Sequence, residues 1–250
     1  MVRLARAGIP RPDSASRSAP PAFLPSRHGF AFANSWPAAP AISVRTPAGR
    51  LGIGNAALGL CGGMVFAALD YWHADRLPPA VQPAPGTPLY RFVVRRLIES
   101  WHIPVAVAGY YRGMLSSDAD LARRTISRQW PRIRALLDDG QPAPLALVTV
   151  DSASPLLLGR NHQVLAYGYE VHGPEVTLAV YDPNSGPDDG VVIRFSTAGT
   201  SGPMGSWVSP GSTVSPRAST AGGFAHTISI GWPVRGFLLT RYRPAEPPTD

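Results

Sequence analysis

The spacing of apolar residues predicts helices in the first half of the chain. Nearly every position from 61 to about 74 is apolar, which is typical of a helix buried on all sides. A second helix is predicted over residues 88–101, because Thr87 can cap its start and its apolar positions fall on one face. Two further helices are expected, one that starts at residues 116–117 and one over residues 131–137.

After Gly140, a residue suited to end the last helix, the pattern changes to short apolar runs separated by turn residues. Such runs are typical of strands. The predicted strands span residues 145–150, 163–171, 176–181, 191–195 and 236–242. Helices followed by strands predict an α+β fold, in which the N-terminal helices pack against a C-terminal antiparallel sheet.

Two segments lack the apolar residues that a core requires. Residues 1–27 are rich in Pro, Ser, Ala and Arg and are expected to form a disordered leader. Residues 196–223 are rich in Gly, Ser and Pro and too long for a simple connection, so they are expected to form a flexible lid or a flexible insertion. A single folded domain is therefore predicted over residues 28–245.

The charge of the chain adds little to this picture. The formal net charge is +7, and every basic residue other than histidine is an arginine. These arginines are scattered, and no helix-turn-helix, zinc or RNA-binding signature accompanies them. The composition therefore argues against a nucleic-acid partner.

Other global features exclude several classes of protein. There is no apolar run of about 18 residues, so no membrane-spanning segment and no membrane partner are predicted. Residues 1–27 lack the apolar core of a secretory signal, so a cytoplasmic location is expected. The single cysteine rules out an intramolecular disulfide and a multi-cysteine metal site, and no metal or other cofactor is expected. The oligomeric state stays open.

The single cysteine, Cys61, stands where a glycine-rich turn enters the predicted buried helix. A helix N-terminus favours the thiolate over the thiol, which makes Cys61 a candidate nucleophile. Gly62 and Gly63 follow it and weaken the helix by about 1 kcal/mol each, but they allow another chain or a substrate backbone to come close. The alternative interpretation is a small buried hydrophobic residue.

A base and an orienting group are predicted from the spacing of two strands. His162 precedes the strand 163–171, Asp182 follows the strand 176–181, and the turn between the strands is centred near residue 173. A hairpin would place His162 and Asp182 side by side at its open end. There Asp182 would accept the Nδ1–H of the imidazole and orient it as a base for a cysteine nucleophile. Taken separately, each residue could equally be a polar strand end or part of an ordinary turn.

Three segments carry a resemblance to a known family. They are Leu60-Cys61-Gly62-Gly63, the segment 161–169 with the sequence Asn-His-Gln-Val-Leu-Ala-Tyr-Gly-Tyr, and Tyr181-Asp182-Pro183-Asn184. Together they resemble the papain-like cysteine peptidases, and more closely the branch typified by bacteriocin-leader-processing peptidases. The resemblance covers about residues 50–195 and the last strand. It implies a papain-like fold in which the nucleophile begins a central helix.

The resemblance also implies a function and one further site residue. In that family a glutamine about six residues before the cysteine helps form the oxyanion hole, and here that position is Asn55. Asn55 and the Cys61 backbone N–H are therefore expected to stabilise an oxyanion, at about 3–4 kcal/mol for one donor in comparable sites. The expected function is a cofactor-independent hydrolase that cleaves a peptide or amide bond through a thioester acyl-enzyme. A thioester-dependent acyltransferase and an inactive binding protein are the alternatives.

Overall fold

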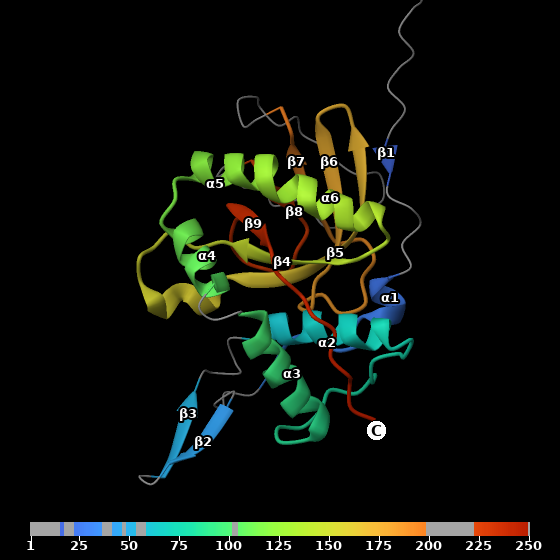
Figure 1. The fold of residues 1–250 in the computed structure, drawn as a ribbon, viewed down its shortest axis with the longest axis vertical. Coiled ribbons are helices and arrows are strands. Elements are labelled where there is room, and N and C mark those ends of the chain that lie inside the picture. Colours follow the sequence, from blue (N-terminus) through green and yellow to red (C-terminus); the bar gives the residue numbers. More distant parts are fainter. Residues whose placement is uncertain are drawn as a thin grey trace, which may run out of the picture.

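The computed structural model describes residues 16–17, 23–36, 42–46, 49–53, 59–101, 105–198 and 223–249. Six α-helices lie in these ranges: α1 (Pro25–His28), α2 (Cys61–His73), α3 (Pro88–Ser100), α4 (Val105–Met114), α5 (Asp118–Arg124) and α6 (Trp130–Asp138). A π-helical turn, Thr125–Gln129, joins α5 to α6, so the two form one continuous rod (Figure 1).

The second half of the chain forms an antiparallel sheet. Its strands are β4 (Ala143–Val148), β5 (His162–His172), β6 (Glu175–Tyr181), β7 (Val192–Ser196), β8 (Ala225–His226) and β9 (Gly236–Leu239), in the order β8-β7-β6-β5-β4-β9. A short strand β1 (Ser16–Arg17) pairs with the far end of β5, and β2 (Ile42–Thr46) and β3 (Gly49–Ile53) form a separate hairpin. The predicted α+β arrangement is confirmed.

Helices cover both faces of the sheet, with α5 and α6 on one side and α2 on the other (Figure 1). On β5, Val164 and Ala166 join the core beneath α6, whereas Leu165 and Tyr167 join the core beneath α2. This alternation follows the period of two along a strand. A β-bulge between Ala166 and Gly168 then reverses the alternation. The helix α2 is buried from Gly62 to Tyr71, as its apolar sequence predicts.

Gly62 and Gly63 serve the packing of α2 against α3. A Cβ atom on Gly63 would overlap the carbonyl oxygen of Val93, and one on Gly62 would lie 2.5 Å from Ser100 Oγ. The close approach that these glycines allow is therefore to α3 of the same chain, and the expectation that they admit another chain or a substrate is not needed to explain them.

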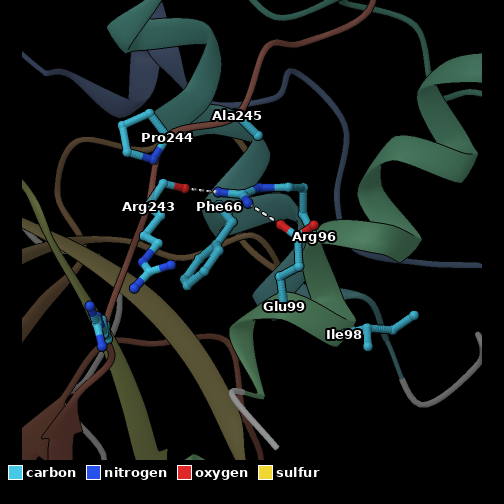
Figure 2. Close-up of a pocket in the computed structure, with 8 residues that line it drawn as sticks. Phe66, Arg96, Ile98, Glu99, Arg243, Pro244 and Ala245 are labelled. Carbon is cyan, nitrogen blue, oxygen red and sulfur yellow. Dashed lines mark hydrogen bonds and ion pairs between the residues drawn. The ribbon is translucent and has the colours of Figure 1, made fainter.

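The chain after β9 crosses α2 and α3. It is anchored by hydrogen bonds to a buried ion pair that joins these two helices. Arg96 Nε lies 2.7 Å from Asp70 Oδ2. Arg96 also donates to the Arg243 carbonyl at 2.8 Å, as Figure 2 shows. Tyr242 Oη and the Ala245 N–H donate to Asp70 Oδ1 at 2.6 and 2.9 Å. This anchoring ends the strand at Leu239, three residues before the predicted end, because the chain leaves the sheet to reach Asp70.

The remaining differences from the sequence predictions concern the ends and the middle of the chain. Phe23 is buried in the core beside α2, and α1 begins at Pro25, so packed structure starts inside the segment expected to be a leader. The helix α4 and the short strand β8 were not predicted. Residues 199–222, most of the expected flexible insertion 196–223, lie outside the described residues. Among the helices that are described, none is long and apolar enough to cross a membrane.

Candidate active site

Cys61 is the first residue of α2 and is only partly buried, unlike the helix that follows it. The turn before it contains Gly59 at φ +91°, where a Cβ atom would lie 2.5 Å from Asn34 Nδ2. No side chain caps the helix, so its first N–H groups are available to an anion at this end. The sequence thus places a thiol where a helix dipole favours its ionised form.

The hairpin of β5 and β6 brings His162 and Asp182 together. Leu165 pairs with Tyr181, so the start of β5 lies beside the residue that follows β6. His162 Nε2 lies 2.7 Å from Asp182 Oδ1, and both side chains are buried. The predicted juxtaposition is present, but the ring is turned the other way: Nε2 contacts the carboxylate, and the expected Nδ1 does not. Nδ1 is left for Cys61, which hydrogen-bonds to the same ring.

Four hydrogen bonds hold the Asp182 carboxylate in place. Its Oδ1 accepts from His162 and from the Asn184 N–H at 2.9 Å, and its Oδ2 accepts from Ser185 Oγ at 3.0 Å and the Ser229 N–H at 2.8 Å. Burial alone would raise the pKa of Asp182, but the charge of His162 and these hydrogen bonds lower it. Asp182 is therefore an anion with a fixed orientation, and it accepts a hydrogen bond from the Nε2–H of His162.

The same balance favours a charged pair of Cys61 and His162. Burial would raise the pKa of the Cys61 thiol, but the charge of His162 and hydrogen bonds from its ring and from the Gln163 and Gly62 N–H groups lower it. Burial would lower the pKa of His162, but the negative charges of Cys61 and Asp182 raise it to about 10. These shifts favour a thiolate beside an imidazolium over a neutral pair.

A cleft of about 450 Å³ opens beside His162. Six residues that define its walls are Asn34, Gly59, Arg160, Asn161, Asn184 and Trp232. It lies between the turn before α2, the start of β5 and the loops that follow β6 and β8. A ligand in this cleft would lie against the imidazole of His162.

Asn34 is a site residue that the sequence analysis did not find. Its Oδ1 accepts from the Leu60 N–H at 2.7 Å and from Trp36 Nε1 at 2.9 Å, and its Nδ2 donates to Asn184 Oδ1 at 3.0 Å. It therefore connects the turn before Cys61 to the turn after Asp182. The only sequence signal for it is an amide among the aromatic residues of the segment 30–36.

Asn55, the expected oxyanion donor, lies outside the described residues. The Cys61 backbone N–H stays a candidate donor from the first turn of α2. His226 is buried in β8 at the sheet edge. Within the described ranges, no three His, Cys, Asp or Glu side chains are grouped so that they could hold a metal ion.

Comparison of the chain with protein-family models, with curated proteins and with solved structures finds no match.

Proposed function

We propose that this protein is a cysteine hydrolase that cleaves a peptide or amide bond through a thioester acyl-enzyme. The observation that carries the proposal is the arrangement of three side chains: a partly exposed Cys61 at a helix start, hydrogen-bonded to His162, whose Nε2 lies 2.7 Å from the buried Asp182. A nucleophile, a base and an orienting group in this order are what acyl transfer through a thiol requires.

The acylation step follows from the charges of the resting site. The Cys61 thiolate attacks the carbonyl carbon, and the electron pair of the C=O bond moves to oxygen. The Cys61 N–H, with Asn55 as a proposed second donor, stabilises that oxyanion. The imidazolium of His162 gives its proton to the leaving amine as the C–N bond breaks, and a thioester on Cys61 remains.

Deacylation reverses the proton path. Neutral His162 takes a proton from water, the hydroxide attacks the thioester, and the thiolate leaves with the acid product released. Asp182 keeps its negative charge throughout and stabilises the imidazolium each time that it forms.

The order of Cys, His and Asp, with the cysteine on a helix and the other two on a sheet, further supports a papain-like fold for this chain.

The direct test is peptide cleavage against a matched inactive variant. Purified protein and its Cys61→Ser variant would be incubated with a peptide library, and new termini would be identified by mass spectrometry. We expect cleavage by the parent protein that is absent in the variant and reduced in His162→Ala. A His172→Ala variant, at the exposed far end of the same strand, should cleave normally. Equal product from the parent protein and Cys61→Ser would overturn the proposal.

A further inference from the structure

The cleft beside His162 has a cationic residue at its edge, Arg160, in addition to His162, whose charge is balanced by Cys61 and Asp182. Among the residues that line it are Arg160 and His162, and none of the lining residues is an Asp or Glu. Arg160 ends the 3₁₀ helix Pro155–Arg160, two residues before His162, so the chain itself fixes the arginine at the edge of the cleft. Its side chain is exposed, and its guanidinium makes no hydrogen bond or ion pair with any other described residue.

The amide side chains of the cleft are already engaged in the protein's own hydrogen bonds. Asn34 and Asn184 bond to each other at 3.0 Å. Asn161 Nδ2 donates to the Leu158 carbonyl at 3.1 Å, and its Oδ1 accepts from the Thr149 N–H at 3.0 Å. These amides therefore shape the cleft and have little capacity left to select a ligand.

Trp232 supplies an apolar part of the cleft lining. Its side chain is 44% exposed, although it belongs to the same loop whose Ser229 N–H is bonded to the buried Asp182. Ile230 also lines the cleft. A large exposed aromatic residue at the rim of a cleft is suited to cover the methylene groups of a bound ligand.

We infer that the cleft binds the part of the substrate next to the scissile bond through a carboxylate, held by Arg160, with Trp232 covering the adjacent methylene groups. A guanidinium is planar and matches a carboxylate with two parallel N–H donors, and it keeps its charge at any physiological pH. The inference rests on the proposed function, since it assigns a substrate class to that site. The carboxylate can belong to an acidic side chain or to the C-terminus of a peptide.

The test uses three alkylating probes that differ only in charge. They are N-bromoacetyl-glutamine amide, which is neutral, N-bromoacetyl-glutamate α-amide, with a side-chain carboxylate, and N-bromoacetyl-glutamine with a free α-carboxylate. Each alkylates Cys61 as the thiolate displaces bromide. The rate for each probe is divided by its rate with free cysteine at the same pH, which removes differences in intrinsic reactivity.

We expect at least one anionic probe to react about 3- to 10-fold faster than the neutral probe, since charge-assisted pairs at exposed sites are of this strength. Whichever anionic probe is faster identifies the source of the carboxylate. The preference should vanish in Arg160→Gln, persist in Arg160→Lys and weaken with added salt. Arg241→Gln, which removes the same charge from an exposed arginine outside this cleft, should leave it unchanged.

Equal corrected rates for all three probes, or a preference that survives in Arg160→Gln, would overturn the inference. The proposed function fails by a different result: Cys61 would react no faster than free cysteine with any of the three probes. Because the inference is read from a ratio of rates and the function from their absolute size, the two failures are distinguishable.

Discussion

Replacing Asp182 with Asn changes one atom at the centre of the charge arrangement. Two donors face each carboxylate oxygen: His162 and the Asn184 N–H at Oδ1, and Ser185 and the Ser229 N–H at Oδ2. An asparagine amide can accept on one side only, so its NH₂ group must face two of these donors in either orientation. If it faces His162, the ring must move its proton to Nδ1 and can no longer accept one from Cys61.

The size of the effect follows from the thiol equilibrium. An ordinary thiol with a pKa of about 8.5 is about 1% thiolate at pH 6.5. We expect a much larger thiolate fraction in the wild-type protein at this pH, because the pKa of Cys61 is lowered and that of His162 is raised to about 10. Allowing for the greater intrinsic reactivity of a more basic thiolate, Asp182→Asn should slow alkylation at pH 6.5 by about 10- to 100-fold.

The assay is the second-order rate of iodoacetamide labelling of Cys61, followed by mass spectrometry from pH 5 to 9. Asp151→Asn, at a carboxylate that is 79% exposed, is the matched control and should label as wild type. Because two buried donors lose their acceptor, we also expect the free energy of unfolding to fall by about 3–5 kcal/mol, so folding is checked by circular dichroism. Labelling of a folded Asp182→Asn variant within twofold of wild type at pH 6.5 would refute the reasoning.

Three other predictions address packing, positioning and protonation. Gly63→Ala should lower the free energy of unfolding in urea by about 2–3 kcal/mol, because the new methyl group meets the Val93 carbonyl. The control Gly173→Ala, at φ +58° with nothing within 4 Å of the new methyl group, should lower it by about 1 kcal/mol. Equal losses in the two variants would contradict this explanation. Asn34→Ala should slow labelling of Cys61 at pH 6.5 by about 10-fold, because the Leu60 N–H and Asn184 lose their hydrogen-bond partner. The control Ser35→Ala should label at the wild-type rate. An unchanged rate in Asn34→Ala would exclude a positioning role for Asn34. Cys61→Ala should lower the pKa of His162 in an NMR titration, because one of the two negative charges that raise it is gone. A raised histidine pKa stabilises the fold below about pH 6.5, and this stabilisation is lost as the pH approaches 10, so in the variant it should be lost at a lower pH. An unchanged His162 pKa would contradict the charged pair.

Local sequence signals predicted several of the helices that surround the site. Thr87 and Ser117 accept hydrogen bonds from the first turns of α3 and α5, as their positions before the helices indicate. The helix α4 was missed because Gly109 and Gly113 interrupt its apolar pattern. Gly113 is required there, since a Cβ atom would lie 2.9 Å from the side chain of Val148.

The candidate site was predictable where it depends on strand pairing and not where it depends on side-chain direction. Reflection across the β5–β6 turn was enough to place Asp182 beside His162. The choice of Nε2 over Nδ1 depends on the rotation of the ring, which no spacing encodes. Asn34 lies 27 positions before Cys61, and only the folded arm brings it to the turn at Leu60. Long-range contacts of this kind leave no local pattern to find.

The most direct measurement of the central claim is the pH profile of Cys61 alkylation in the parent protein and in His162→Ala. An ion pair predicts fast labelling well below pH 8 in the parent protein, and a return to the profile of an ordinary thiol in the variant. If the parent protein already shows an ordinary thiol profile, and the substitution leaves it unchanged, Cys61 and His162 do not form a charged pair and the proposed hydrolase mechanism is wrong.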